Sequence, residues 1–352
     1  MLKVLVIGAG SIGNHLANAS RNKGWNVSIY DIDQEALIRT KEDIYPSRYE
    51  HWDESINLIN EFPKNEYFDI VLIGTPPDTH IGIANEILTA ISTKIILIEK
   101  PLCPPDLNGL SLLQEKLLGS NTKVLVGYNH NLTVNTKFVE KLIVKGILGE
   151  PLSMHVRWLE HWGGIFGAHP WLDGPQDSYL GFWERGGGAC AEHSHAISIW
   201  QHFSNYMDCG KIKEVSAVIN RFEQNSLNYD ESTIISVKSE NGLVGSIIQD
   251  VITDPSKKNL RIQGTDGFIE WYVNYDTDHD AVIYGETGSK YEKKLIPKSR
   301  PDDFTGEIDH IDELVNNPSN TSPISFELGS ECMKVIASVF ESDRAGSKVI
   351  ID

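Results

Sequence analysis

Short apolar runs alternate with longer mixed segments through the first third of the chain. Buried strands are indicated at residues 4–7, 26–30, 69–73, 123–127 and, with the loop that follows it, 94–102. Segments of helical character separate several of these strands, for example at residues 79–90 and 107–118. This alternation predicts a parallel sheet with helices on both faces, in which ligands bind beyond the carboxyl ends of the strands.

The pattern changes after residue 150, where apolar and polar positions alternate with a period of two. Turn signals such as Glu240-Asn241-Gly242 separate the alternating segments, so the second part of the chain is expected to be rich in strands. The expected strands are residues 151–158, 213–221, 232–237, 243–250, 259–263, 268–273 and 281–284. No internal repeat or long linker interrupts them.

Length and composition agree with two globular domains. The chain has 352 residues, more than the roughly 100–200 residues of a usual single domain. Hydrophobic residues make up 40% and charged residues 23%, as in an ordinary folded protein. No apolar run approaches the ~18 residues of a membrane span, and the first residues enter a strand without a signal-peptide pattern. We therefore expect a cytoplasmic protein.

The charge balance excludes several classes of partner. The formal net charge of −18 repels nucleic acid and anionic membrane surfaces, and no basic patch offsets it. The expected partner is a small molecule, with no nucleic acid and no membrane. Four widely spaced cysteines form no CxxC pair, so buried free thiols are expected in place of a zinc or redox site.

A glycine-rich turn follows the first strand in the stretch KVLVIGAGSIGNHL. Gly8 permits the tight turn, Gly10 lets a pyrophosphate approach the backbone, and Gly13 allows close packing of helix and strand. The following helix begins with free N–H groups and the positive end of its dipole. This GxGxxG pattern therefore predicts a dinucleotide site.

The second strand ends in Asp31, which lies 18 residues beyond Gly13. An acidic side chain there can accept hydrogen bonds from the ribose hydroxyls of adenosine and repels a 2′-phosphate. NAD is therefore favoured over NADP. The alternative is that Asp31 is a turn residue and that Asp33 or Arg39 adjusts the preference, so NADP stays possible.

Two further loops are expected at the same edge of the sheet, because each follows a parallel strand. One contains Thr75, Pro76 and His80, and the other contains Glu99, Lys100 and Pro101. Lys100 comes directly after a buried strand and before a proline, a setting that can aim its ammonium group at a substrate. The alternative is a solvated loop lysine.

These motifs resemble those of the Gfo/Idh/MocA family of sugar and cyclitol oxidoreductases. The resemblance rests on GAGSIG at residues 8–13, GTPPDTH at 74–80, EKPL at 99–102 and the closing segment from residue 322, and it covers essentially the whole chain. It implies an NAD(P)-dependent dehydrogenase acting on CH–OH groups. The cofactor-binding residues expected from motifs and resemblance together are Gly8, Gly10, Ser11, Ile12, Gly13, Asp31, Thr75, Pro76, His80, Glu99 and Lys100.

The resemblance also implies the domain organisation. An α/β Rossmann domain is expected at residues 1–125, followed at 126–352 by an α+β domain with a large, mostly antiparallel open-faced sheet that binds substrate. The last helix is expected to pack back on the first domain. Because the open sheet commonly serves as a dimerisation face in this family, a homodimer or homotetramer is expected.

The stretch GGGACAEHSH at residues 186–195 carries the next candidate chemistry. A loop of glycines entering a helix over residues 189–203 would place Glu192 and His195 on one helical face. Family members commonly carry an aspartate four residues after the last glycine and a histidine eight after it. Here Glu192 keeps the fourth position and His195 arrives at the seventh, which changes the register of the pair.

Two other interpretations of this stretch remain open. Glu192, His193 and His195 can be read as metal ligands, but on a helix His193 and His195 diverge, so at most two of the three converge and no metal is expected. The histidines can also cap or pack the helix. Proton transfer or substrate binding is the favoured interpretation.

Candidate substrate contacts lie in the irregular segment before these glycines and after the fifth parallel strand. Long loops on a rigid scaffold commonly carry specificity, and tryptophan faces suit the CH surfaces of a sugar. The aromatic residues can equally pack a lid or a subunit contact. The candidates are Asn129, His161, Trp162, His169, Tyr179 and Arg185.

The expected reaction is hydride transfer between a secondary alcohol of a sugar, cyclitol or nucleotide sugar and the nicotinamide. His195 is expected to act as the base, Lys100 to supply charge and relay the proton, and Glu192 to orient His195 or bind an adjacent hydroxyl. The first two roles can be exchanged. The alternatives are a non-catalytic dinucleotide-binding sensor or co-regulator, and a metal-dependent enzyme on the same scaffold.

Overall fold

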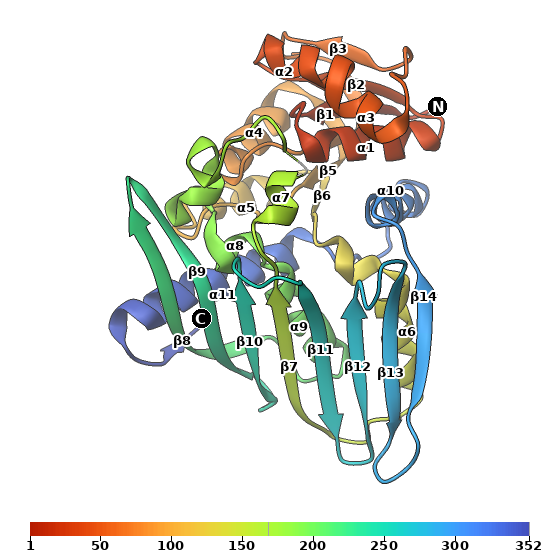
Figure 1. Ribbon diagram of the computed structural model, residues 1–352. Coiled ribbons are helices and arrows are strands. Elements are labelled where there is room, and N and C mark those ends of the chain that lie inside the picture. The colour runs from red at the N-terminus through yellow and green to blue at the C-terminus, as the bar shows by residue number, and fades with distance from the viewer. Residues whose placement is uncertain (168, 352) are drawn as a thin grey trace. The chain divides into compact units, whose positions relative to one another are not determined.

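The computed structural model describes residues 1–167 and 169–351, which form two compact units (Figure 1). Unit 1 comprises Met1–Cys103, Leu107–Asn129 and Pro301–Phe326. Unit 2 comprises Pro104–Asp106, His130–Arg300 and the described residues from Glu327 onward. The unit boundary at 129/130 lies four residues beyond the expected domain boundary at 125/126. The later segment of unit 1, Pro301–Phe326, comes before the last helix of the chain.

Unit 1 is built on a six-stranded parallel sheet, as the apolar runs predict. The central parts of β1, β4, β5 and β6 are apolar because helices cover both faces of the sheet. The strand order is β3-β2-β1-β4-β5-β6, the order of a dinucleotide-binding fold. The strands are β1 (Lys3–Ile7), β2 (Asn26–Tyr30), β3 (Asn57–Ile59), β4 (Tyr67–Ile73), β5 (Ser92–Ile98) and β6 (Lys123–Val126). Only the short edge strand β3 was not expected.

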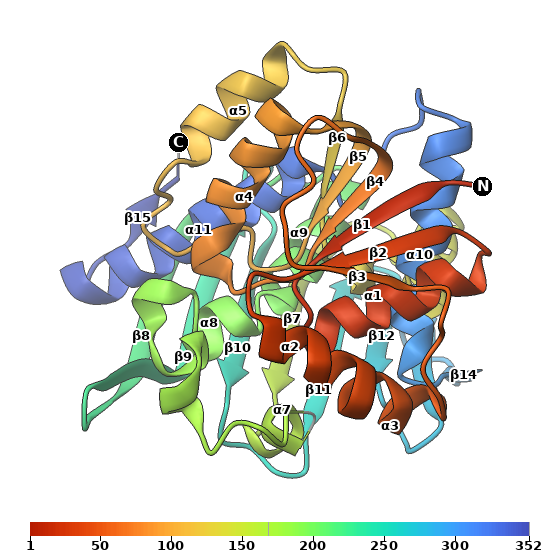
Figure 2. The ribbon, with the colours of Figure 1, turned by 90° about the horizontal axis from the view of Figure 1, so that it is seen from above.

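Helices cover both faces of this sheet. Figure 2 shows α4 and α5 on one side and α1, α2 and α3 on the other. Helix α1 also packs against α10, where the ring of His15 stacks on Phe304 with centroids 4.5 Å apart. The helices of unit 1 are α1 (Ser11–Asn22), α2 (Gln34–Arg39), α3 (Tyr45–Tyr49), α4 (Pro77–Ala90), α5 (Leu110–Leu118) and α10 (Pro301–Asn316).

Unit 2 is built on a nine-stranded sheet, which confirms the expected large, mostly antiparallel architecture. Its order is β14-β13-β12-β11-β7-β10-β9-β8-β15, and the β7–β10 pair is parallel. Strand β14 was not expected, whereas β15 lies in the closing segment that resembles the last helix and strand of the family. The strands are β7 (Pro151–Leu159), β8 (Ile212–Gln224), β9 (Leu227–Ser239), β10 (Val244–Asp250), β11 (Lys257–Gly264), β12 (Gly267–Val273), β13 (His279–Glu286), β14 (Glu292–Pro297) and β15 (Val349–Ile350).

One face of this sheet is covered by helices and the other is open. On β7 the side chains of Val156 and Trp158 are buried, whereas His155 and Arg157 on the opposite face are exposed. This alternation matches the period of two in the sequence. The helices of unit 2 are α6 (Val134–Val144), α7 (Gly163–Gly167), α8 (Gly188–Glu192), α9 (His195–Tyr206) and α11 (Phe326–Ala345).

The helices and the cysteines bear on two expectations from the sequence, one about membrane spans and one about free thiols. In residues 1–167 and 169–351, no helix combines the length and apolar character that crossing a membrane requires. All four cysteines are buried free thiols, which confirms that expectation.

Candidate functional site

The glycine-rich loop of unit 1 has the close packing that the motif predicts. A Cβ at Gly13 would lie 1.9 Å from the carbonyl oxygen of Gly8, so only glycine lets α1 approach the turn. A Cβ at Gly10 would meet no atom within 4 Å, which leaves open space beside the backbone. Gly10 is the N-cap of α1, whose first N–H groups face that end of the helix. The loop therefore fits a pyrophosphate.

Asp31 is tied to the same loop through its carboxylate. Oδ2 accepts the N–H of Ala9 at 2.8 Å, and Oδ1 accepts the N–H of Asp33 at 2.9 Å. Each carboxylate oxygen has a second lone pair. Asp31 is partly exposed and can therefore accept a further hydrogen bond from a ribose hydroxyl.

The loops after β4 and β5 are braced by His80. Its Nδ1 lies 3.0 Å from the carbonyl oxygen of Pro101 and its Nε2 lies 2.7 Å from that of Thr75. Burial lowers the pKa of His80 to about 4, so the ring is neutral at physiological pH and donates its single N–H to one of these two carbonyl oxygens. His80 thus joins the two expected cofactor loops, and a cofactor contact for it stays a prediction.

Lys100 follows β5 and is partly exposed, whereas its neighbour Glu99 is buried. Glu307 of α10 is also fully buried. Burial, together with the charges of Glu99 and Asp303, raises the pKa of Glu307 well above its usual range. The carboxyl group of Glu307 therefore lies close enough to that of Glu99, the residue before Lys100, for the two to interact.

In unit 2, four side chains form one row across the covered face of the sheet. Thr233 pairs with Gln249, Gln249 with Trp158, and Trp158 with Lys258. These residues lie on β9, β10, β7 and β11, which are adjacent strands, so their side chains lie side by side. We call Thr233, Gln249, Trp158 and Lys258 the transverse row. It forms the floor of the candidate site.

His195 lies on this floor. Its ring stacks on the indole of Trp158, with centroids 5.4 Å apart and planes inclined at 24°. The ring of His130 meets His195 edge-on at 4.7 Å and Trp158 edge-on at 4.9 Å. Two aromatic rings, those of Trp158 and His130, thus fix the plane of the imidazole, while His195 itself stays partly exposed.

Glu192 is partly exposed and is held by Tyr179, whose hydroxyl donates to its Oε2 at 2.8 Å. The expectation of a single helix over residues 189–203 is wrong, because α8 ends at Glu192 and α9 begins at His195. The turn between them tightens at His193, whose carbonyl oxygen accepts the N–H of Ala196 and the side-chain amide of Gln249. Glu192 and His195 therefore lie on two short helices.

Lys258 brings a positive charge to the transverse row. Its Nζ lies 5.4 Å from the ring centroid of Trp158 and 2.7 Å from Oε1 of Glu160. Burial of Glu160 disfavours its ionisation, but Lys258 and His193 outweigh burial and hold its pKa below the usual range. A lysine paired with a carboxylate therefore lies beside the same indole on which His195 stacks.

The other residues expected to contact substrate each have separate local surroundings. Trp162 is 8% exposed and packs with Leu180, Ala189, Tyr229 and Val251. His161 is exposed and accepts the N–H of Gly163, and His169 is partly buried with its Nδ1 at 2.7 Å from the carbonyl oxygen of Ile165. Arg185 lies over the ring of Phe182 at 5.9 Å, and Asn129 of unit 1 is 8% exposed. Substrate contacts by these residues stay predictions.

The sequence patterns did not predict three polar residues around Trp158, namely Lys258, Gln249 and Glu160. The signal that could have found the first two is a polar residue on an apolar strand face. Lys258 shares its face with the buried Leu260 and Ile262, and Gln249 shares its face with Ile247. Polar groups on a core face need partners, so such positions mark a site or a buried anchor.

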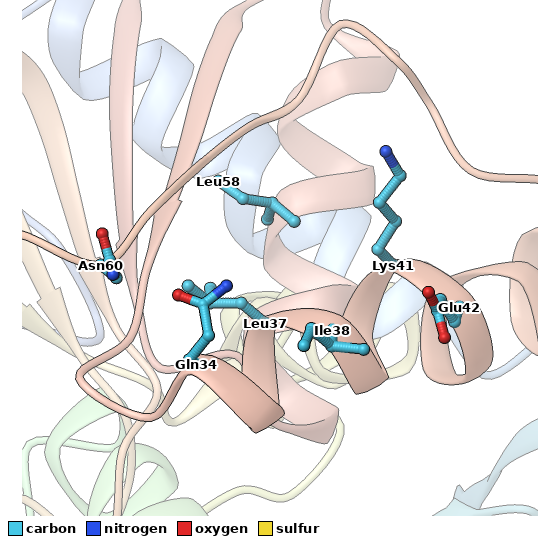
Figure 3. Close-up of a pocket in the computed structure, with 7 residues that line it drawn as sticks. All are labelled: Gln34, Leu37, Ile38, Lys41, Glu42, Leu58 and Asn60. Atoms are coloured by element: carbon cyan, nitrogen blue, oxygen red, sulfur yellow. The ribbon is translucent and has the colours of Figure 1, made fainter.

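A shallow hollow of about 240 Å³ lies against α2 in unit 1 (Figure 3). Its lining contains none of the expected cofactor or substrate residues. The lining residues are Gln34, Leu37, Ile38, Lys41, Glu42, Leu58 and Asn60. In the described part of the chain, no three His, Cys, Asp or Glu side chains are grouped as a metal site.

Two family models match the chain. The model of the oxidoreductase family with an NAD-binding Rossmann fold matches residues 2–128, and the GFO/IDH/MocA C-terminal domain model matches residues 136–270. The chain belongs to the Gfo/Idh/MocA family of oxidoreductases. It is an NAD-dependent oxidoreductase whose cofactor domain is unit 1.

Solved structures share this fold at low sequence identity. Levoglucosan dehydrogenase, in complex with NADH and levoglucosan, has a TM-score of 0.79 and 19% identity, covering 100% of this chain and 99% of that chain. The WlbA dehydrogenase from Bordetella pertussis, in complex with NADH and UDP-GlcNAcA, has a TM-score of 0.72 and 17% identity, with 100% and 99% covered. An oxidoreductase domain protein from Kribbella flavida has a TM-score of 0.79 and 16% identity, with the same coverage. None of the curated protein sequences compared matches the chain.

Proposed function

We propose that the protein oxidises a secondary alcohol of a sugar, cyclitol or nucleotide sugar, or reduces the corresponding ketone. The observation that carries this proposal is His195, stacked on Trp158 while partly exposed and with Glu192 nearby in the chain. An imidazole fixed in this way can remove a hydroxyl proton without first losing rotational freedom.

Each chain residue has a distinct role in the proposed reaction. His195 removes the proton of the reacting hydroxyl in oxidation and returns it in reduction. Lys100 supplies the positive charge that stabilises the developing alkoxide, and Glu192 binds an adjacent hydroxyl or orients His195. NAD supplies the acceptor for the hydride that leaves the carbinol carbon. The alcohol thus loses one hydride and one proton and becomes a ketone.

The side chains around His195 in unit 2 support a polyhydroxylated substrate. The partly exposed side chains of His195, Tyr179 and Glu192 combine aromatic surface with hydrogen-bonding groups. Sugars need both kinds of contact, because their CH faces are apolar and their hydroxyls donate and accept. Structural neighbours named for levoglucosan and UDP-GlcNAcA complexes agree with this substrate class.

A substrate panel tests the proposal. The purified protein is incubated with NAD or NADP and with levoglucosan, L-sorbose, myo-inositol or UDP-GlcNAcA, while the absorbance of the reduced cofactor is followed. We expect turnover with NAD and at least one compound. Lys100→Met and His195→Asn should each lower kcat by at least about 100-fold. Dissociation constants for NADH that change by less than about twofold would confine the loss to the chemical step.

The rival function is a dinucleotide-binding sensor that controls a partner. Tight NADH binding without turnover of any member of a broad polyol, sugar and nucleotide-sugar panel would favour it. A metal-dependent enzyme would instead lose activity with a chelator and regain it with one divalent ion.

We also propose that the open face of the nine-stranded sheet joins copies of the chain into a homodimer or homotetramer. Val218 and Ile234 pair across β8 and β9 on that face and are 69% and 53% exposed. Large exposed apolar side chains in neighbouring positions are typical of a subunit interface. Light scattering of the native protein and of Ile234→Lys tests this: a native monomer would contradict it.

A further inference from the structure

The α8 segment cannot hold its own conformation. It contains five helical residues, far fewer than the roughly 12–15 that a helix needs to be stable alone in water. Gly186 and Gly188 adopt positive φ values of 91° and 79° at its start, which weakens the backbone preference further. Some other part of unit 2 must therefore fix the segment that ends in Glu192 and leads to His195.

Asp230 of β9 binds the donor side of this segment. Its Oδ2 accepts the N–H of Cys190 at 2.5 Å and the hydroxyl of Thr233 at 3.1 Å. A Cβ at Gly188 would lie 1.9 Å from Oδ1 of Asp230, so the segment touches the carboxyl group where only glycine fits. Asp230 is completely buried.

Gln249 of β10 binds the acceptor side of the same segment. Its Nε2 lies 2.8 Å from the carbonyl oxygen of His193, 3.1 Å from that of Cys190 and 3.3 Å from that of Ala189. The carbonyls of Ala189 and His193 also accept the backbone N–H groups of His193 and Ala196, so Gln249 adds a side-chain donor to the end of α8 and the turn after it. Gln249 is also completely buried and belongs to the transverse row.

We propose that Asp230 and Gln249 are positioning residues that hold the segment from Gly188 to His193 by its N–H groups and its carbonyls. Through it they fix where Glu192 and His195 stand over Trp158. This inference rests on the proposed function, because it assigns the two residues a role in that reaction.

The charge environment of Asp230 indicates a role beyond packing, because its carboxyl group is buried at a cost. Burial raises the pKa of Asp230 to about 6. Hydrogen bonds from Cys190, from its own N–H and from Thr233 lower the pKa, as does the charge of Arg221, but burial outweighs them. The ionisable groups acting on it are therefore Arg221 of β8 and the thiol of Cys190 on α8. Burial and the charge of Asp230 raise the pKa of that thiol well above its usual range, so it stays neutral. A buried carboxyl that is costly to ionise is a poor choice for packing alone.

Two substitutions and two controls test the inference. Asp230→Asn and Gln249→Met keep side-chain size but weaken the bonds to the segment. Asp250→Asn is the control for the first, because Asp250 also accepts backbone N–H groups, those of Ile252 and Thr253. Gln263→Met is the control for the second, because Gln263 donates to the carbonyls of Gly264 and Gly267.

Hydrogen exchange gives a readout that needs no substrate. We expect amides of residues 188–195 to exchange about 10-fold faster in both test variants and at the native rate in both controls. With the substrate found in the panel, kcat should fall about 10-fold or more while the dissociation constant for NADH stays unchanged. If Asp230→Asn does not fold, Thr233→Val removes one neighbour of Asp230 and serves as the milder variant.

Two results would overturn the inference. Native exchange in residues 188–195 of both test variants would show that the contacts do not hold the segment. Faster exchange with unchanged kcat and KM would show that the segment is held for stability alone. If no substrate turns over, the proposed function fails, while the exchange result still decides separately whether the segment is held.

Discussion

The imidazole of His195 lies on the indole of Trp158, with ring centroids 5.4 Å apart and planes inclined at 24°. Trp158 in turn is fixed in the sheet between Gln249 on β10 and Lys258 on β11. The orientation of the proposed base is therefore set by a strand residue, which is more rigid than a loop residue. This relationship can be tested by shrinking the indole.

Trp158→Phe should lower kcat about 10-fold, because a smaller ring leaves the imidazole free to tilt away from the reacting hydroxyl. The cavity should also lower the free energy of unfolding by about 1–3 kcal/mol. Trp25→Phe is the control, since Trp25 is a buried indole of unit 1 that is 5% exposed. Steady-state kinetics and urea unfolding separate the two effects. Equal losses of kcat in both variants would contradict a specific role for Trp158.

Tyr179→Phe should raise KM or lower kcat about 10-fold, because the hydroxyl that donates to Glu192 at 2.8 Å is removed. The matched control is Tyr272→Phe, whose hydroxyl donates to Glu270 at 2.8 Å on the same sheet. Initial rates with the panel substrate measure the change. Unaltered kinetics in Tyr179→Phe would mean that Glu192 does not need this hydroxyl for its role.

The two loop glycines should respond differently to one added methyl group. Gly13→Ala places its Cβ 1.9 Å from the carbonyl of Gly8 and should lower the melting temperature. Gly10→Ala meets no protein atom within 4 Å, so its fold should be preserved while NADH affinity falls about 10-fold or more. Differential scanning fluorimetry and NADH fluorescence titration give the two readouts. Native NADH affinity in Gly10→Ala would exclude the pyrophosphate from this loop.

The amino-terminal half of the site was accessible from sequence because its signals are local. Gly8, Gly10 and Gly13 surround one turn, and Lys100 immediately follows one strand. Parallel pairing then brings the carboxyl ends of β1, β2, β4 and β5 to one edge of the sheet without any further information. The family resemblance supplied the antiparallel sheet of unit 2.

The transverse row could not be predicted from the sequence in the same way. Trp158 is far in sequence from Gln249 and Lys258 and becomes their neighbour only through the register of β7, β10 and β11. The break between α8 and α9 has the same origin, since the carbonyl of His193 binds Gln249 from another strand. The helical periodicity of residues 189–203 is a local pattern and cannot indicate that long-range contact, so it predicted one continuous helix.

Asp31→Ser should shift cofactor preference toward NADP. The carboxylate repels a 2′-phosphate, whereas a hydroxyl does not. Its loss also removes the acceptor for the N–H of Ala9, at 2.8 Å, so affinity for NADH should fall about 10-fold. Titrations with NADH and NADPH give the ratio of dissociation constants. The prediction fails if that ratio is the same in the variant and the native protein.

Asp230 should make stability depend on pH in a direction opposite to that of a salt-bridged carboxylate. Its pKa rises from 3.8 to about 6 in the folded protein, so the folded state binds the proton more tightly than the unfolded state. Relative to Asp230→Asn, the native protein should lose stability as pH rises from about 4 to about 6. The loss should reach about 3 kcal/mol and then level off.

The comparison with Asp230→Asn is needed because His80 acts in the reverse sense. Burial lowers the pKa of His80 to about 4, so His80 makes the fold less stable as pH falls from 6.5 toward 4. Both proteins contain His80, and its contribution cancels in the difference between their free energies of unfolding. Urea unfolding at a series of pH values provides that difference. A difference that stays constant between pH 4 and pH 7 would show that Asp230 titrates normally and that its burial carries no cost.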